Sequence, residues 1–215
     1  MKISYAVFDL DGTLIDSMHI WDNIGDEILE AHNITPPKDL REKLVTLSIM
    51  QSAEYLKENF PLPLSVEEII DLITAKAEEN YKFKITLKPY VKEYLEKLKG
   101  QRVRMAVATA NDDQITREIL NRLGILDYFE FIITCNEVGC SKEEPKIYQL
   151  AAEKFGCAPK DLVVFEDAFH CIKTAKNAGF YVVGVADKNS ERYKDEIKSL
   201  CDFYIDSFKE MGDEN

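Results

Sequence analysis

Two aspartates near the start of the chain have the type and spacing that metal binding and nucleophilic chemistry need. An apolar run from Ile3 to Phe8 ends in the sequence DLDGTLIDS, where Asp9 and Asp11 stand on either side of Leu10. Because side chains alternate along a strand, both carboxylates project from the same side of the chain. They repel each other unless a cation lies between them, and Mg²⁺ with oxygen ligands fits this need. One carboxylate is then free to act as a nucleophile or as an acid and base.

The segment DLDGTLIDS resembles the opening motif of the haloacid dehalogenase-like superfamily of aspartyl-phosphate hydrolases. The resemblance implies that Asp9 is a nucleophile that forms an aspartyl phosphate. It implies that Asp11 protonates the leaving oxygen and then activates water. It also implies a Mg²⁺ ion held by Asp9, by the main-chain carbonyl of Asp11 and by Asp167. The acid at position 11 favours phosphate esters over the dehalogenase branch, which lacks an aspartate there. An ordinary turn that ends a strand is the alternative for this segment.

Short apolar segments that alternate with amphipathic segments follow from residue 103 onward. This alternation predicts a doubly wound, Rossmann-like α/β core with a parallel sheet covered on both faces. The strands predicted to join the first one are Val103–Ala108, Phe131–Thr134, Leu162–Phe165, Tyr181–Val185 and Phe203–Ile205.

Residues 17–86 break this alternation and contain apolar residues at helical spacing. Ser65 and Glu68 have the spacing of a capping box ahead of one of these helices. We therefore expect an all-helical cap domain at 17–86, inserted into a core domain formed by 1–16 and 87–215, with hinges near the two crossings. Such an insertion resembles the helical cap of the superfamily. The candidates for substrate choice in this domain are Met18, His19, Trp21, Ile49 and Met50.

Polar residues follow the second core strand, where Thr109-Ala110-Asn111 precedes a helix that begins near Asp112. A hydroxyl group and free backbone N–H groups at a helix N-terminus suit a phosphate. Thr109 matches the superfamily's second motif, so we expect Thr109, Ala110 and Asn111 to bind the substrate's phosphate. The alternative is that these are ordinary cap residues, and that Asn111 caps the helix or orients its neighbours.

Lys142 stands three residues before Pro145, which matches the third motif. An ammonium group there would neutralise the transferring phosphoryl group and the attacking carboxylate, so we assign Lys142, with Thr109, to catalysis and substrate binding. A solvated lysine paired with neighbouring glutamates is the alternative. Two residues depart from the family pattern at this motif: Glu143 replaces the usual proline and Lys146 the usual aspartate.

The strand at 162–165 ends in two acids, Glu166 and Asp167, which matches the fourth motif. The resemblance implies that Asp167 is a metal ligand that faces Asp9. We expect Glu166 to complete the metal site by orienting Asp167 or a metal-bound water, or to contact the Lys142 ammonium. Two departures from the family pattern follow, where relatives often have serine and glycine: Ala168 and Cys171.

The net charge of −12 and the isoelectric point near 4.8 argue against nucleic acid or an anionic membrane as a partner. No apolar segment approaches the length of a membrane span, and the chain begins without a signal-type cleavage pattern. The five cysteines lack paired metal-site spacing. We therefore expect a cytoplasmic monomer with reduced thiols.

Together these features predict a magnesium-dependent phosphatase that hydrolyses a small-molecule phosphomonoester. One alternative is a phosphosugar mutase of the β-phosphoglucomutase type, which relies on a basic cap residue to hold a second phosphate. The corresponding segment, 44–51, contains neither lysine nor arginine. The other alternative is a catalytically idle domain that binds a phosphorylated ligand, but such a domain would be free to lose Asp9 or Asp11.

Overall fold

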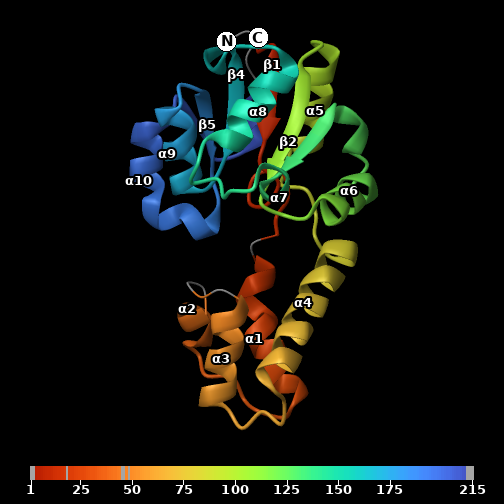
Figure 1. The fold of residues 1–215 in the computed structure, drawn as a ribbon, viewed down its shortest axis with the longest axis vertical. Coiled ribbons are helices and arrows are strands. Elements are labelled where there is room, and N and C mark those ends of the chain that lie inside the picture. Colours follow the sequence, from red (N-terminus) through yellow and green to blue (C-terminus); the bar gives the residue numbers. More distant parts are fainter. Residues whose placement is uncertain (1–2, 18, 45–46, 48, 212–215) are drawn as a thin grey trace. The chain divides into compact units, whose positions relative to one another are not determined.

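The computed structural model describes residues 3–17, 19–44, 47 and 49–211, apart from the side chains of residues 19, 21, 22 and 42. The chain divides into two compact units (Figure 1). Residues 1–16 and 86–215 form one unit, which we call the α/β unit, and residues 17–85 form the other, which we call the helical unit.

The α/β unit is built on a six-stranded parallel sheet with the strand order β3-β2-β1-β4-β5-β6. Its inner strands are near-continuous apolar runs, as expected for strands that are covered on both faces. The strands are β1 Tyr5–Phe8, β2 Arg104–Thr109, β3 Phe131–Thr134, β4 Leu162–Glu166, β5 Tyr181–Val185 and β6 Phe203–Ile205.

Helices cover both faces of this sheet, which confirms the doubly wound core. Of the principal helices of this unit, two lie between β1 and β3 along the chain, and three lie between β3 and β6. Right-handed crossovers place these two groups on opposite faces. The principal helices are α5 Val91–Gly100, α6 Asp113–Arg122, α8 Lys146–Phe155, α9 Phe169–Asn177 and α10 Lys194–Leu200.

The two faces have separate apolar contacts. On one face Ile147 of α8, Ile172 of α9 and Ile197 of α10 belong to a single buried cluster. On the other face Tyr94 of α5 packs edge-on against Phe165 of β4, with ring centroids 5.8 Å apart. The sheet is thus the middle layer of three, and its strand ends are free to carry polar side chains.

Two strands extend one residue further than predicted, and this matters for the site. The ladder between β2 and β3 pairs Thr109 with Thr134, and the ladder between β4 and β5 pairs Glu166 with Gly184. Thr109 and Glu166 are therefore the last residues of their strands rather than the first residues of loops. A short helix that was not predicted, α7 Cys135–Val138, follows β3 directly.

The helical unit contains four helices among its described residues and no strand among them. The predicted capping box at the start of its longest helix is confirmed. The backbone N–H of Glu68 donates to the Ser65 hydroxyl at 3.2 Å, and the backbone N–H of Ser65 donates to the Glu68 carboxylate at 2.7 Å. The helices are α1 His19–Ala31, α2 Leu40–Leu44, α3 Ile49–Asn59 and α4 Val66–Phe83.

Within the α/β unit, the chain segments on either side of the insertion pair with each other. Ile15 forms an antiparallel bridge with Leu87, and the backbone N–H of Lys88 donates to the carbonyl of Leu14 at 3.0 Å. We call residues 86–88 the return segment, because the chain re-enters the α/β unit there.

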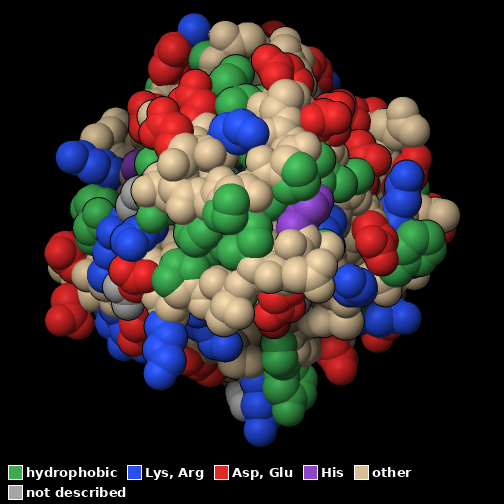
Figure 2. All heavy atoms as spheres, turned by 90° about the horizontal axis from the view of Figure 1, so that it is seen from below, with side chains coloured by type: hydrophobic (Ala, Val, Ile, Leu, Met, Phe, Trp, Pro, Cys, Tyr) green, Lys and Arg blue, Asp and Glu red, His purple; other side chains and the backbone are tan. Residues whose placement is uncertain are grey.

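None of the described helices combines the length and the apolar character needed to cross a membrane. All five cysteines are free thiols, as predicted. On the face drawn in Figure 2, acidic and basic side chains of the described residues are interspersed, and no broad basic patch covers that face.

Candidate active site

The predicted site residues lie at the carboxyl end of the sheet, where the chain's path reverses direction. Strand β1 lies between β2 and β4, and ligands of open α/β sheets bind in the crevice outside such a switch point. Asp9 follows β1 directly, and its backbone N–H donates to the carbonyl of Phe165 at 3.0 Å. This hydrogen bond places Asp9 beside Glu166 and Asp167, which come from the end of β4.

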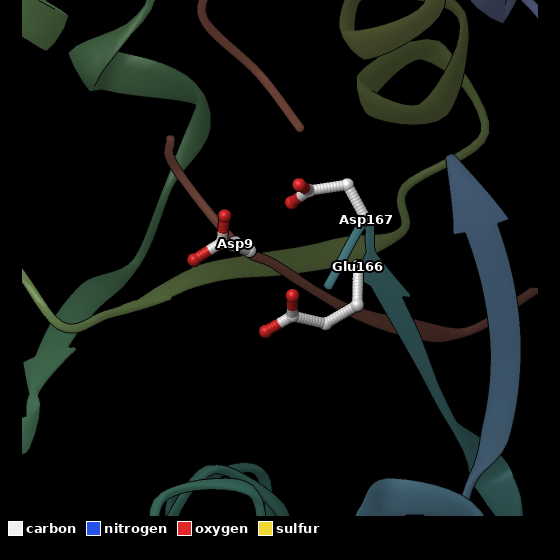
Figure 3. Close-up of side chains that lie close together, drawn as sticks. All are labelled: Asp9, Glu166 and Asp167. Atoms are coloured by element: carbon white, nitrogen blue, oxygen red, sulfur yellow. The ribbon is translucent and has the colours of Figure 1, made fainter. Parts of the chain in front are cut away.

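Three carboxylates meet at this point. Asp9, Glu166 and Asp167 each offer one oxygen, and these oxygens all lie within 4.8 Å of one another. Figure 3 shows the three side chains extending to the same side of the strand ends. All three are buried. Oxygen-only donors of high negative charge suit a hard divalent cation, so this acidic cluster is able to hold a metal ion.

The ammonium group of Lys142 neutralises part of this charge. It donates to Oδ1 of Asp9, and it donates to Oε1 of Glu166 at 2.6 Å. Its side chain is only 5% exposed, so the alternative of a solvated lysine is wrong. Burial favours the neutral amine, but the carboxylates of Asp9 and Glu166 outweigh burial and raise the pKa of Lys142. Burial raises the pKa of Asp9 well above its usual range, and Lys142 opposes this shift.

The hydroxyl group of Tyr148 is a further buried donor to the cluster, and the sequence interpretation missed it. It donates to Oε1 of Glu166 at 2.8 Å. Since Lys142 donates to the same oxygen, Oε1 of Glu166 accepts hydrogen bonds from two buried donors. Tyr148 lies three residues after Pro145 in α8, which is about one helical turn. The third motif predicted a helix after Pro145, so Tyr148 could have been expected on the same face of that helix as the motif.

Asp167 is held by the loop that follows β1. The hydroxyl of Thr13 donates to Oδ1 of Asp167 at 3.0 Å. A Cβ atom at Gly12 would lie 2.5 Å from Oδ2 of Asp167, and Gly12 has a φ of +85°, so this position requires glycine. Burial and the Glu166 carboxylate raise the pKa of Asp167 to about 8 in the metal-free protein.

The second motif provides a separate set of contacts. The hydroxyl oxygen of Thr109, which is fully buried, accepts a hydrogen bond of 3.0 Å from the backbone N–H of Asn111. The side-chain amide of Asn111 donates to Oδ2 of Asp11 at 3.2 Å. Asp112, not Asn111, caps helix α6, through a 2.8 Å hydrogen bond from the backbone N–H of Gln114. The sequence left open whether Asn111 caps the helix or orients its neighbours. In the structure its side chain orients Asp11.

Ala110 is exposed beside this pair, at the start of the turn between β2 and α6. The Thr109–Asn111 segment is connected to the first motif through the hydrogen bond between Asn111 and Asp11. Asp11 itself is not a member of the acidic cluster.

The residues that depart from the family pattern have different environments. Lys146 forms an exposed ion pair of 2.8 Å with Glu144. Ala168 precedes α9 without a side-chain cap, whereas Cys171 is buried on that helix. Burial, reinforced by the Glu166 carboxylate, raises the pKa of the Cys171 thiol, which keeps it protonated.

Two of the five candidates for substrate choice can be placed. Ile49 and Met50 begin α3 and are 38% and 55% exposed, which is unusual for such apolar side chains. Met18 and the side chains of His19 and Trp21 lie outside the described residues.

The fold and this cluster define the class of the protein: a Rossmann-like α/β protein with a carboxylate site, able to hold a metal ion, at its topological switch point. Residues 6–185 match the family of haloacid dehalogenase-like hydrolases. The chain belongs to this family.

Individual relatives are similar over most of their length. A phosphorylated carbohydrates phosphatase of Thermotoga maritima is 27% identical over 174 residues, which are 81% of each chain. Hexitol phosphatase B of Escherichia coli is 25% identical over 98% of this chain and 95% of its own. Among solved structures, β-phosphoglucomutase of Clostridium difficile shares the fold, with a TM-score of 0.69 and 23% identity over 98% of this chain and 93% of its own.

Proposed function

We propose that this protein is a magnesium-dependent phosphatase that hydrolyses a small phosphorylated molecule through an aspartyl-phosphate intermediate on Asp9. The observation that carries the proposal is the buried ammonium of Lys142, which contacts both Asp9 and Glu166 within an acidic cluster whose oxygens lie within 4.8 Å of one another. A nucleophilic carboxylate, a fixed cation and a metal-capable set of oxygens are the groups that phosphoryl transfer requires.

The metal ion would be held by Asp9, Asp167, the main-chain carbonyl of Asp11 and Glu166, directly or through water. The fit rests on the donor set, which consists of oxygens alone and carries more negative charge than Lys142 neutralises. When bound, Mg²⁺ supplies a positive charge that offsets the charge on the phosphoryl oxygens and on the attacking carboxylate.

The first half of the reaction transfers the phosphoryl group to the protein. A carboxylate oxygen of Asp9 forms a bond to phosphorus, and the bond between phosphorus and the ester oxygen breaks. Asp11 gives its proton to that leaving oxygen, which departs as an alcohol. The hydrogen bond from Asn111 to Oδ2 of Asp11 supports this role, because it fixes the direction of the carboxyl group.

The second half of the reaction restores the protein. Asp11, now ionised, takes a proton from a water molecule, whose oxygen forms a bond to phosphorus. The bond between phosphorus and Asp9 breaks, and inorganic phosphate leaves. Throughout, Lys142 and the segment Thr109-Ala110-Asn111 would bind the phosphoryl oxygens, the latter through the Thr109 hydroxyl and through backbone N–H groups near the start of α6.

The substrate is proposed to be a small organic phosphate, because the similar proteins named above act on phosphorylated carbohydrates and hexitol phosphates. The exposed side chains of Ile49 and Met50 are the described candidates for contact with its organic part. Neither carries a charge, so they suit a neutral leaving group rather than a second phosphate.

The test is phosphate release from a panel of phosphomonoesters, with Mg²⁺ and with a chelator, for the wild type, Asp9→Asn and Asp11→Asn. We expect Mg²⁺-dependent release by the wild type alone. Release by Asp9→Asn at the wild-type rate would contradict the proposed nucleophile. No release from any ester by the wild type, with a folded protein and added Mg²⁺, would contradict the phosphatase function.

A phosphosugar mutase is the alternative that the fold also accommodates. Such an enzyme needs a cation for the second phosphate, and the lysines Lys57 and Lys76 of the helical unit are both engaged within that unit. Lys57 donates to the carbonyl of Leu62 at 3.0 Å, and Lys76 pairs with Glu27 at 2.7 Å. Hydrolysis is therefore favoured. Isomerisation of a sugar monophosphate that depends on added sugar bisphosphate would reverse this choice.

A further inference from the structure

A second ion pair, with mostly buried side chains, lies outside the acidic cluster, and the mechanism above does not use it. The ammonium of Lys88 lies 2.9 Å from Oδ2 of Asp187, and the two side chains are 12% and 5% exposed. Lys88 also donates to the carbonyl of Ala186 at 2.6 Å. Oδ1 of Asp187 accepts a hydrogen bond of 2.9 Å from the backbone N–H of Asn189. Removing two charges from water costs about as much free energy as their attraction returns, so stability alone does not account for this pair.

The ion pair acts on the metal-ligand candidate Asp167. After burial and Glu166, the carboxylate of Asp187 is the next cause that raises the pKa of Asp167, and the ammonium of Lys88 is the main cause that lowers it. Both groups therefore belong to the electrostatic environment of Asp167. Lys88 supplies positive charge on the Asp167 side of the cluster, as Lys142 does on the Asp9 side.

The pair also fixes the return segment to the end of β5. Lys88 belongs to this segment, and Asp187 stands two residues after the last residue of β5. The backbone N–H of Lys88 donates to Leu14, and Ile15 bridges to Leu87. The return segment is thus held by its backbone on one side and by the Lys88 side chain on the other.

This anchorage reaches Asp167 through the loop that follows β1. The backbone N–H of Gly12 donates to the carbonyl of Ile15 at 3.0 Å, and Ile15 is the residue that bridges to the return segment. Gly12 and Thr13 are the residues of this loop that lie against Asp167. A continuous set of contacts therefore connects Lys88 with the position of the Asp167 carboxylate.

We propose that Lys88 and Asp187 together form a positioning device for the metal ligand Asp167. The inference rests on the proposed function in that it takes Asp167 as a ligand of Mg²⁺. Without Lys88, the return segment would lose its side-chain anchor to the end of β5. Without Asp187, the Lys88 ammonium would lose its ion-pair partner and keep only the carbonyl of Ala186. Only the intact pair keeps this anchorage complete.

The test is calorimetric titration of the metal-free protein with Mg²⁺ alone, for Lys88→Met, Asp187→Asn and the double variant. The matched control is Lys176→Met, which breaks a partly buried pair of 2.7 Å between the last turn of α9 and Asp202, the residue before β6. Thermal unfolding of each variant shows whether it is folded at the temperature of the titration. If Lys88→Met does not fold, Asp187→Asn, which preserves side-chain shape, carries the same test.

We expect each single variant to bind Mg²⁺ about tenfold more weakly than the wild type, because the return segment and the loop that holds Asp167 lose their anchorage, an effect of the size seen when the support of a metal ligand is removed. The double variant restores the charge balance, so its loss should be clearly smaller than the product of the two single losses. The control should bind as the wild type does. Two results would overturn the proposal. One is single variants that bind Mg²⁺ within threefold of the wild type, and the other is a double variant whose loss of affinity equals the product of the two single losses.

This experiment separates the inference from the proposed function. Mg²⁺ binding is measured without turnover, so it remains informative if no phosphate ester is hydrolysed. Normal Mg²⁺ binding by a wild type that releases no phosphate would contradict the phosphatase function, while weaker binding by the two single variants would still support the positioning role.

Discussion

The hydroxyl group of Thr13 donates a hydrogen bond of 3.0 Å to Oδ1 of Asp167, although the two residues are 154 positions apart in the chain. Both are buried. The loop after β1 therefore supplies not only the two aspartates of the first motif but also a donor that orients the acid at the end of β4. The bond thus fixes the orientation of a carboxylate that belongs to the acidic cluster.

Replacing Thr13 with valine keeps the size and branching of the side chain and removes the donor. We expect Mg²⁺ affinity to fall about 10- to 100-fold, since Asp167 loses the partner that fixes it. Thr13→Ser, which keeps the hydroxyl group, should retain most of the affinity. Calorimetric titration with Mg²⁺ measures both, and equal affinities of the valine variant and the wild type would show that Thr13 does not orient Asp167.

Replacing Gly12 with alanine should disrupt the site more severely. The left-handed backbone of Gly12 costs an alanine about 1–2 kcal/mol, and the added Cβ would lie 2.5 Å from Asp167. We expect a lower free energy of unfolding in urea and loss of Mg²⁺ binding. Gly100→Ala is the matched control, because a Cβ at the end of α5 meets nothing within 4 Å. If both variants were as stable as the wild type, the close approach of Gly12 to Asp167 would be wrong.

Tyr148→Phe removes one of the two donors to Oε1 of Glu166 and leaves the packing of the ring intact. A buried hydrogen bond to a charged group contributes about 1.5–3 kcal/mol, so the metal-free variant should lose stability of this order. Tyr128→Phe removes a hydrogen bond of 3.2 Å to Glu96 at the surface and should change stability by less than about 0.5 kcal/mol. Equal effects of the two changes in urea unfolding would contradict a stabilising buried hydrogen bond between Tyr148 and Glu166.

The raised pKa of Asp167 predicts a coupling between pH and Mg²⁺. Its value of about 8 in the metal-free protein lies above its ordinary value of 3.8, so the folded state binds a proton that the unfolded chain releases. The resulting stability is fully present below about pH 3.8 and is lost as the pH rises through 8. Mg²⁺ binds the ionised form, so its binding below pH 8 should release a proton from Asp167.

Calorimetry in two buffers with different heats of ionisation measures this proton release. We expect the apparent heat of Mg²⁺ binding at neutral pH to differ between the buffers, and the difference to shrink above pH 8. The stabilisation of the protein by Mg²⁺ against heat should be larger at high pH than at low pH. Identical heats in both buffers at neutral pH would contradict a protonated Asp167.

Much of the fold could be predicted because its signals are local. Apolar runs bounded by turns specify the strands, and a capping box such as that of Ser65 and Glu68 specifies a helix start from residues three positions apart. Strand ends were harder, because whether Thr109 or Glu166 still belongs to a strand depends on its partner in the neighbouring strand. The short helix α7 was missed for a similar reason, since four residues carry no periodicity.

The candidate site also contains residues that could be predicted from the sequence and residues that could not. Asp9, Lys142, Glu166 and Asp167 could be predicted to lie together, because each follows or precedes a recognisable strand or helix end. The ion pair between Lys88 and Asp187 could not, because its members are far apart in sequence and each resembles an ordinary surface charge. Only the folded chain shows that they pair with each other and that their side chains are mostly covered.

The central claim, that Asp9 receives the phosphoryl group, is tested most directly by mass spectrometry of acid-quenched reaction mixtures. The wild type is mixed with Mg²⁺ and the best ester from the panel, quenched during turnover and digested. We predict that the peptide containing Asp9 gains the mass of one phosphoryl group, and that the same peptide from Asp9→Asn does not. Steady phosphate release with no phosphorylated Asp9 peptide at any quench time would contradict the account.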